Sequence, residues 1–481
     1  MSPPARNPDQ PATRTERDTM GEMQVPVDAL YGASTARAVE NFPIAGRPLP
    51  PAVIHAFGHL KAACAQANKD LGKLDARLAD AIIAAADEVA RGLHDNQFPV
   101  DVYQTGSGTS TNMNANEVIA SLANEKLGLG ATTKADGGVH PNDHVNMGQS
   151  SNDTFPTAMC IAAGLATQKQ LQEALGLHLL PALQSLAGKW DQIIKVGRTH
   201  LMDATPIRVG QAFSGYAWQI EKAAEAASWA SSAVTSNMPI GGTAVGTGIN
   251  AHPDFAAKVC TALEQSLGLH FEEAENHPEA QAAKDSFVDA HGRLKTIAVS
   301  LSKIANDIRH LGSGPRCGIG ELVLPAIQPG SSIMPGKVNP VICESVMQVC
   351  CRVVGNDATV TMAGMGGVGS IFELNVAMPV MIDAFLESVT LLANVCNVFV
   401  DKLLVGLEVN EERCAELLDA SLMTITALAP EIGYEKCAAL AKQAHKEGKT
   451  IKQLVGEQNL MPPERLEELM NYDSMTRPEA S

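Results

Sequence analysis

The chain has 481 residues, of which 45 % are hydrophobic and 19 % are charged, so it is long enough to form two or three globular domains. Its formal net charge of −17 argues against binding to nucleic acid or to an anionic membrane. An anionic substrate would therefore need positive potential supplied by the site itself. Aromatic residues make up only 4 %, and Ala, Leu and Val dominate, which favours closely packed helices.

The 10 cysteines form no C-x-x-C pair, so we expect reduced thiols and neither a structural zinc nor an iron–sulfur cluster. Two histidine pairs are spaced by four residues, His55 with His59 and His140 with His144. Neither carries the Glu of the zinc-binding H-E-x-x-H motif, so we expect no metal and no cofactor. We find no stretch of about 18 apolar residues and no signal or transit peptide, which predicts a cytoplasmic protein without a membrane span.

In chain order, residues 1–50 are rich in proline and predict an irregular lead-in. Helical patterns follow at 52–70 and 76–93. A dense polar segment, residues 105–117 (T-G-S-G-T-S-T-N-M-N-A-N-E), then precedes an apolar helical run at 118–127. Ser, Thr and Asn are common helix N-caps, but this segment holds more hydroxyls and amides than one cap needs. Its functional interpretation is an anion site at a helix N-terminus.

A second polar block, residues 140–152 (H-P-N-D-H-V-N-M-G-Q-S-S-N), also precedes an apolar segment. The clearest periodicity lies further on, from Asp285 to Leu311, where apolar residues recur every seven residues. They are Phe287, Leu294, Leu301 and Ile308, and, three residues later in each case, Ala290, Ile297, Ile304 and Leu311. The pattern predicts a helix of about 40 Å in a bundle.

Similar apolar patterns at 211–236, 341–361 and 377–404 predict further long helices, which bury themselves most readily against one another, often across subunits. After Gly406 the density of charge rises, which predicts a small helical domain at the C-terminus.

Loops rich in glycine lie between the long helices. Residues 330–340 (G-S-S-I-M-P-G-K-V-N-P) form a shaped loop with hydroxyl, ammonium and amide groups, which hold carboxylates and stabilise charge on oxygen. Residues 197–206 contain His200, a candidate general acid or base. The loop 241–250 lacks the lysine of a P-loop.

Residues 364–369 match the G-x-G-x-x-G pattern. If the preceding residues 357–362 formed a strand, the match would indicate a dinucleotide-binding fold and an oxidoreductase. No βαβ alternation surrounds it, so we do not favour that interpretation.

Together, these blocks resemble the signature segments of the fumarase/aspartase superfamily. Residues 330–340 are similar to its signature loop. Five earlier segments resemble its other signature segments and occur in the family's order: T-G-S-G-T-S-T-N-M-N, H-P-N-D, S-S-N-D, G-R-T-H-L and G-P-R-C-G-I-G-E. Gly336 and His200 favour the class II (iron-independent) fumarase branch, because aspartases usually carry Ala and Gln there. The resemblance implies a mainly α fold with three domains and a long-helix bundle that forms a twenty-helix tetramer core. We place the domains at 1–149, 150–406 and 407–481.

The resemblance also implies a carbon–oxygen lyase, fumarate hydratase, which adds water to fumarate reversibly to give L-malate. Each active site would be built from three subunits of a homotetramer. Ser331 would remove the C3 proton, and His200, held by Glu344, would act through a water on the hydroxyl. The groups implied to hold the developing aci-carboxylate are Lys337, Asn339 and Ser332. The residues implied to bind the substrate carboxylates are Ser107, Gly108, Thr109, Ser150, Ser151, Asn152 and Thr199.

Two alternative functions concern the same scaffold, aspartate ammonia-lyase and a non-catalytic structural role. A separate question is whether the chain has a second anion site, at His140, Asn142 and Asp143. Some bacterial fumarases carry an arginine three residues before this histidine, and Gly137 stands there in this chain, which argues against the second site.

Overall fold

The computed structural model describes residues 12–478 of the chain. The chain divides into two compact units. Unit 1 runs up to residue 172 and includes residues 225–296 and 351–392, and unit 2 comprises residues 173–224, 297–350 and the chain from 393 onward. The three-domain division with boundaries after residues 149 and 406 stays a prediction.

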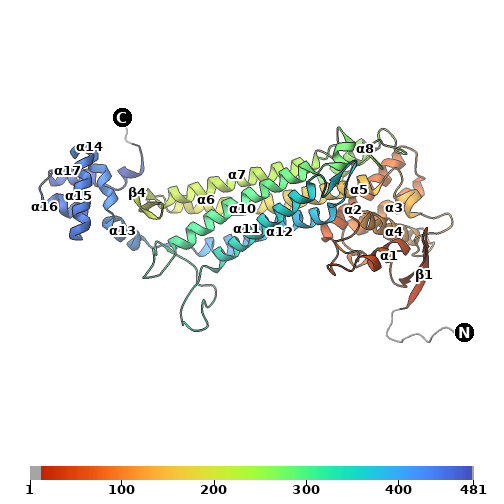
Figure 1. Ribbon diagram of the computed structural model, residues 1–481, viewed down its shortest axis with the longest axis horizontal. Helices are drawn as coiled ribbons and strands as arrows, with labels where there is room; N and C mark the ends of the chain where they lie inside the picture. The colour runs from red at the N-terminus through yellow and green to blue at the C-terminus, as the bar shows by residue number, and fades with distance from the viewer. Residues whose placement is uncertain (1–11, 479–481) are drawn as a thin grey trace. The chain divides into compact units, whose positions relative to one another are not determined.

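Unit 1 consists of helices with two small β-hairpins (Figure 1). Its strands are β1 (Thr13–Asp18), β2 (Gly21–Pro26), β6 (Ser370–Ile371) and β7 (Leu374–Asn375), paired as β1–β2 and β6–β7. The helices wholly inside it are α1 (Ala33–Asn41), α2 (Pro51–Asp70), α3 (Ala76–Ala90), α4 (Thr109–Lys126), α5 (Ser151–Ala166), α8 (Phe255–Leu267) and α9 (His277–Ala282).

Unit 2 contains an antiparallel hairpin, β3 (Ile194–Thr199) with β4 (Met202–Arg208), and a short pair, β5 (Leu322–Val323) with β8 (Glu408–Val409). The helices wholly inside it are α6 (Leu180–Lys189), α13 (Glu411–Ala420), α14 (Ala429–Ile432), α15 (Tyr434–Glu447), α16 (Ile451–Glu457) and α17 (Pro463–Leu469). The last helices share a core that includes Leu428, Ala444, Ile451 and Val455. The described residues after Gly406 are thus mainly helical, and their forming a separate small domain stays a prediction.

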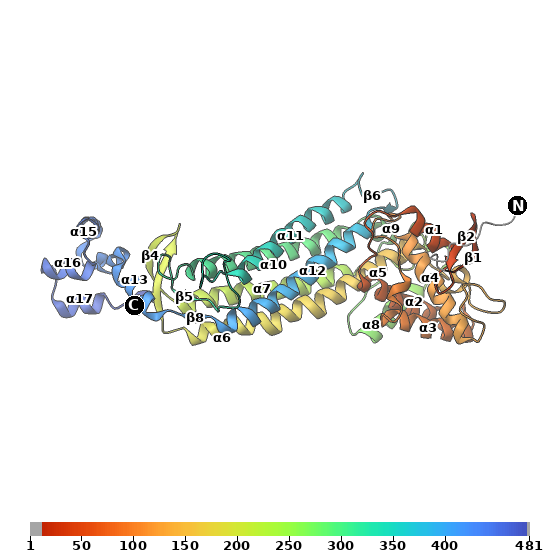
Figure 2. The ribbon, with the colours of Figure 1, turned by 90° about the horizontal axis from the view of Figure 1, so that it is seen from below.

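Four long helices contribute to both units: α7 (Val209–Thr235), α10 (Asp285–Leu311), α11 (Val341–Gly364) and α12 (Met378–Lys402). The seven-residue repeat predicted both ends of α10 correctly, and its apolar positions are buried except for Leu311, which is partly exposed. Within unit 2, segments of these helices and α6 form a helical bundle, as Figures 1 and 2 show. The prediction of a mainly α fold is confirmed.

One local prediction is wrong, and one alternative that was not favoured is excluded. The region 12–50 is not wholly irregular, because β1, β2 and α1 form there. Residues 357–362, considered as a strand before the G-x-G-x-x-G match, lie inside helix α11. The dinucleotide-binding interpretation therefore loses the strand on which it depends.

A further correction concerns α12. The sequence predicts no segment that could span a membrane, but α12 is long and apolar enough to do so by length and composition alone. The most apolar 18-residue window of the segment Met378–Gly406 has a mean hydropathy of 1.5, and half of that window is buried. Its buried residues include Met381, Phe385 and Leu392, so packing against other helices accounts for the apolar character. Apolar helices at the centre of helix bundles pass the same test.

Helices α10, α11 and α12 carry a buried polar network in unit 1. His291 is fully buried; its Nδ1 lies 3.1 Å from Oδ1 of Asp357, and its Nε2 lies 2.9 Å from the hydroxyl of Ser388. Asn356 donates to the same hydroxyl at 3.1 Å, and Lys295 pairs with Asp357 at 2.5 Å. Burial lowers the pKa of His291, which favours the neutral imidazole.

Candidate active site

The polar segment 105–117 forms the start of α4 rather than a linker before it. The helix begins at Thr109, nine residues before the predicted apolar run, and Gly108 caps it with φ +72°. A Cβ on Gly108 would lie 2.0 Å from the ring of Phe155, and one on Gly106 would lie 1.7 Å from the carbonyl oxygen of Val376. Glycine is therefore required at both positions, and Ser107 is fixed between them.

Four of the five hydroxyls predicted to bind carboxylates, those of Ser107, Thr109, Ser150 and Ser151, lie where α4 and α5 begin, whereas Thr199 is the last residue of β3. Thr109 Oγ1 lies 2.9 Å from Ser107 Oγ and 2.8 Å from Ser151 Oγ. Ser150 caps α5 and accepts a hydrogen bond from the backbone of Asn152 at 3.2 Å. The free N–H groups and the dipoles of both helices favour an anion at this point.

A pocket of about 580 Å³ lies over these helix starts, and we call it the carboxylate pocket. Its lining includes Thr109, Ser150 and Ser151, together with Asn112, Asn142, Asp143, Asn146 and Gln149. Asn152 uses its side-chain amide elsewhere, donating to the carbonyl oxygen of Ala244 at 2.8 Å. The structure therefore brings Thr109, Ser150 and Ser151 together around the pocket, whereas the Asn152 side chain holds the glycine-rich loop.

Asp153 links α5 to the glycine-rich loop 241–250. Its carboxylate accepts hydrogen bonds from the backbone N–H groups of Ser150 at 2.9 Å, Thr243 at 2.9 Å and Gly241 at 3.2 Å. Burial raises the pKa of this carboxyl to about 6, although the three hydrogen bonds oppose the shift. The glycine-rich loop 241–250 thus closes one side of the carboxylate pocket.

The loop 330–340 is held at its base and exposed at its tip. The backbone N–H of Gly330 donates to the carbonyl oxygen of Lys337 at 2.7 Å, and the Asn339 side chain donates to the carbonyl oxygen of Gly330 at 2.7 Å. Gly336 has φ +80°, as a glycine-shaped loop requires. Ile333 is 83 % exposed at the tip.

Ser331 lies inside this loop with its hydroxyl oxygen facing two backbone donors. The Oγ accepts hydrogen bonds from the N–H groups of Ile333 at 3.2 Å and Met334 at 3.0 Å. Donors in this position stabilise negative charge on the oxygen. Lys337 is exposed, and no hydrogen bond or ion pair of its ammonium group occurs among residues 12–478.

His200 lies at the tip of the β3–β4 hairpin. Thr199 pairs with Met202, so His200 and Leu201 form a two-residue turn, with φ of +56° and +64°. This turn type favours Asn and Gly, and a histidine in the left-handed region costs about 1–2 kcal/mol. Strain of this kind marks positions where a side chain is needed for function. Leu201 is 81 % exposed beside it.

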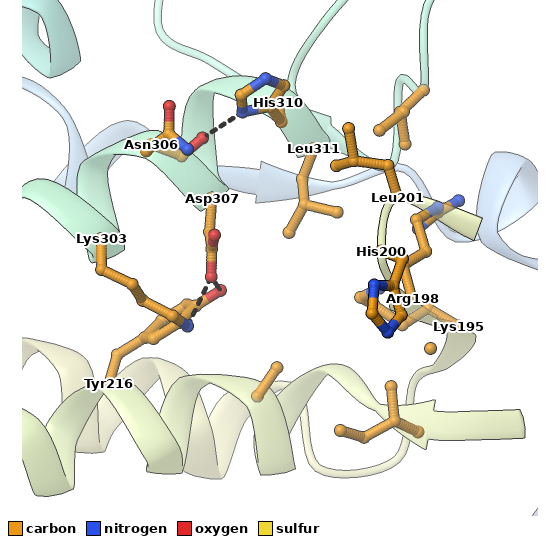
Figure 3. Close-up of a pocket in the computed structure, with 14 residues that line it drawn as sticks. Lys195, Arg198, His200, Leu201, Tyr216, Lys303, Asn306, Asp307, His310 and Leu311 are labelled. Carbon is orange, nitrogen blue, oxygen red and sulfur yellow. Dashed lines mark hydrogen bonds and ion pairs between the residues drawn. The ribbon is translucent and has the colours of Figure 1, made fainter. Parts of the chain in front are cut away.

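Figure 3 shows a second pocket, of about 530 Å³, between the His200 hairpin and residues of α7 and α10. His200, Lys195 and Arg198 lie on one side of it, and Tyr216, Lys303 and Asp307 on the other. Below the hairpin the carboxylate of Glu321, only 1 % exposed, pairs with Arg198 at 2.9 Å and Lys195 at 3.1 Å. This buried triad fixes the base of the hairpin that carries His200.

Some of the predicted groupings are not formed within one chain. Glu344 is exposed, and no hydrogen bond or ion pair joins it to His200 in the described structure. At the proposed second anion site, His140 Nδ1 accepts hydrogen bonds from the N–H groups of Asn142 at 3.3 Å and Asp143 at 3.2 Å. Burial lowers the pKa of His140, which disfavours the cationic form that would attract an anion.

A guanidinium does lie beside Gly137, but it comes from α3: Arg77 donates to the Gly137 carbonyl oxygen at 2.8 Å. In residues 12–478, no group of three or more His, Cys, Asp or Glu side chains could hold a metal ion. Sequence reasoning missed the buried Lys61, Asp153 and Glu321. Lys61 carried a visible signal, since it is a charged residue in an otherwise apolar helical stretch.

The comparisons with known proteins agree with the geometry. Residues 21–355 match the family model described as lyase, and residues 425–477 match that of the fumarase C C-terminus. The chain is 54 % identical over 457 residues to a class II fumarate hydratase of Corynebacterium glutamicum, covering 95 % of this chain and 93 % of the relative. It is also 54 % identical over 458 residues to that of Mycobacterium tuberculosis, covering 93 % and 92 %.

Two solved structures extend the likeness to the fold. The class II fumarase of Schistosoma mansoni matches with a TM-score of 0.93 and 38 % identity, covering 98 % of this chain and 100 % of that one. A fumarate lyase:delta crystallin of Brucella melitensis bound to cobalt matches with a TM-score of 0.92 and 42 % identity, covering 97 % and 100 %. The chain belongs to the lyase family and, within it, to the class II fumarate hydratases. The family assigned from the signature segments is confirmed.

Proposed function

We propose that the chain catalyses the reversible hydration of fumarate to L-malate, the activity named in its relatives. The observation that carries this proposal is the pair of backbone N–H groups directed at Ser331 Oγ, 3.2 and 3.0 Å away. A serine hydroxyl is a poor base unless its oxyanion is stabilised, and these donors supply that stabilisation.

In the direction from malate, Ser331 removes a proton from C3, next to a carboxylate. The charge moves onto that carboxylate, which becomes an aci-carboxylate dianion. We assign its stabilisation to the Lys337 ammonium, the Ser332 hydroxyl and the N–H of Asn339 that is not donated to Gly330. The proton then resides on Ser331 Oγ until it passes to solvent.

His200 acts on the departing hydroxyl through a water molecule, and Glu344 orients the imidazole. Within one chain both residues are exposed and unpaired with each other, which supports completion of the site by other chains. We therefore propose a homotetramer in which each site takes residues from three chains. The exposed Leu201 beside His200 is consistent with a hairpin tip that another chain covers.

The two substrate carboxylates are bound by hydroxyl groups, those of Ser107, Thr109, Ser150, Ser151 and the exposed Thr199. The backbone at Gly108 and Asn152 contributes to this binding. Two helix N-termini in the carboxylate pocket offset the net negative charge of the chain locally. We also propose a cytoplasmic location, a three-domain organisation and catalysis without a metal ion.

The test is the ultraviolet absorbance of fumarate after L-malate is added to the purified protein in ammonia-free buffer with a chelator. The absorbance is expected to rise to a plateau. It would not rise if the chain lacked the proposed activity. Aspartate ammonia-lyase, on the same fold, is not favoured, because the relatives from Corynebacterium glutamicum and Mycobacterium tuberculosis are both named class II fumarate hydratase. Fumarate consumed only with ammonia present would reverse that choice.

A further inference from the structure

Lys61 of helix α2 is fully buried, yet the structure gives its ammonium group no carboxylate partner within hydrogen-bonding distance among residues 12–478. Its Nζ donates to two side-chain amide oxygens, Oδ1 of Asn146 at 3.0 Å and Oε1 of Gln149 at 2.9 Å. A buried charge is usually paired with an opposite charge, because neutral partners recover only part of its hydration energy. Lys61 therefore calls for a functional explanation.

Both amides that contact Lys61 line the carboxylate pocket. Asn146 Oδ1 accepts two further hydrogen bonds, each at 3.2 Å, from the side chains of Asn112 and Asn116. Gln149 donates to the carbonyl oxygens of Val145 and Met147, each at 3.1 Å. Lys61 thus lies directly behind the pocket wall and holds the turn that leads into Ser150 and Ser151.

One buried carboxyl, that of Asp153, interacts electrostatically with Lys61. Asp153 also accepts hydrogen bonds from three backbone N–H groups, and burial raises its pKa to about 6. Burial lowers the pKa of Lys61 to about 8, which leaves the ammonium largely protonated at neutral pH. Asp143, at the pocket rim, is 74 % exposed at its side chain and is screened by water.

We propose that Lys61 is an electrostatic and positioning residue for the substrate: it supplies the buried positive charge for a dicarboxylate dianion and fixes Asn146 and Gln149 in the pocket wall. It does not touch the substrate. This inference rests on the proposed function for the identity of the anion, a short dicarboxylate. The buried positive charge of Lys61 lets a chain of net charge −17 attract that anion.

The experiment measures binding by calorimetry, so it does not depend on turnover. Succinate, a dianion that cannot be hydrated, is compared with its monomethyl ester, which carries one charge. In Lys61→Met the dissociation constant of succinate is expected to rise on the order of tenfold, and that of the ester by about threefold or less. A merely structural role would weaken both ligands equally, and that result would overturn the proposal.

Lys284 offers a matched control, because it is also buried and its pKa is also lowered to about 8. Among residues 12–478 its ammonium donates only to backbone carbonyls, those of Ala280, Gln281 and Ala283, none of which lines the carboxylate pocket. Lys284→Met is expected to leave the succinate-to-ester ratio of dissociation constants within about twofold of the original. A ratio that changes as far as in Lys61→Met would also overturn the proposal.

If Lys61→Met does not fold, the double variant Lys61→Met/Asp153→Asn also removes the buried carboxyl that interacts electrostatically with Lys61. The same selective loss of succinate binding is expected, and an unchanged ratio would count against Lys61. Failure of the proposed function would give a different result. The original chain would then bind succinate but would not hydrate fumarate.

Discussion

The hydroxyl oxygen of Ser331 accepts a hydrogen bond from the backbone N–H of Met334 at 3.0 Å, within the same loop. The donor and the acceptor are only three residues apart, so the loop itself prepares the oxygen to carry negative charge. This local arrangement needs no other part of the protein.

Ser331→Ala is expected to lower kcat by at least about 100-fold and to change KM little, because the hydroxyl acts in proton removal rather than in binding. Steady-state kinetics with L-malate measure both constants. Ile333→Ala keeps the hydroxyl and both backbone donors, and its kcat is expected to stay within a few-fold. Turnover of Ser331→Ala within a few-fold of the original would exclude Ser331 as the base.

His200→Asn is expected to lower kcat by about 100-fold, the usual size of a general acid–base contribution. Asparagine tolerates the left-handed backbone that His200 adopts, with φ +56°, so the hairpin should keep its shape. His310 lines the same pocket, but its imidazole contacts a backbone carbonyl of its own helix, that of Asn306. His310→Asn serves as the control and should keep kcat within about threefold; equal losses in both variants would contradict a special role for His200.

Gly106→Ala is expected to destabilise the protein, because the new methyl group would lie 1.7 Å from the carbonyl oxygen of Val376. Overpacking against the backbone costs about 1–3 kcal/mol or more, so the melting temperature should fall by several degrees. Gly188, in helix α6, has no atom within 4 Å of its would-be Cβ. Gly188→Ala should raise stability slightly, and differential scanning fluorimetry compares the two variants.

The stability difference between Asp153→Asn and the original chain is expected to depend on pH. The folded-state pKa of Asp153, about 6, is above its ordinary value of 3.8, so the folded state binds the proton more tightly than the unfolded state. The original chain therefore loses stability as pH rises from about 4 to about 6, by up to about 3 kcal/mol, and the Asp153→Asn variant does not. Melting temperatures at about pH 4.5 and about pH 7 measure this. The melting temperature of Asp153→Asn minus that of the original chain should be larger at the higher pH. A difference that becomes smaller at the higher pH would contradict the raised pKa of Asp153.

Glu321→Gln is expected to lower the melting temperature strongly and to reduce kcat through the His200 hairpin. The substitution leaves Arg198 and Lys195 partly buried without their carboxylate, at a cost of about 3–5 kcal/mol. Glu416, which pairs with Arg413 at 3.1 Å, is exposed, so Glu416→Gln should change stability by less than about 0.5 kcal/mol. Similar melting temperatures for the two variants would show that the buried triad does not stabilise the hairpin.

The sequence predicted most where one physical signal dominated. The seven-residue repeat from Phe287 to Ile308 placed helix α10 to the residue, since each apolar position faces the buried side. The start of α4 was misplaced because its first turns are polar and yet buried: Asn112, Asn114 and Asn116 are at most 1 % exposed. Hydropathy cannot distinguish a buried amide network from a surface loop.

The site itself divides in a similar way. The residue types of the signature loop and of the two helix starts were visible in the sequence, because glycine, hydroxyl and amide residues cluster there. The turn at His200 and the partners of Lys61 were not visible, since both depend on contacts that no local pattern encodes. Lys61 contacts Asn146 and Gln149, which lie 85 and 88 positions away in the chain.

The buried network of Ser388, His291 and Asp357 has the distances of a hydrolase catalytic triad, 2.9 Å and 3.1 Å, but the Ser388 side chain is fully buried and closed to any substrate. Its consequence is mechanical. If α10, α11 or α12 slid along its axis by one turn, about 5.4 Å, these polar groups would lose their partners in an apolar interior. Each orphaned group would cost about 1–3 kcal/mol, so the network permits a single axial alignment of three helices whose apolar faces alone would tolerate sliding.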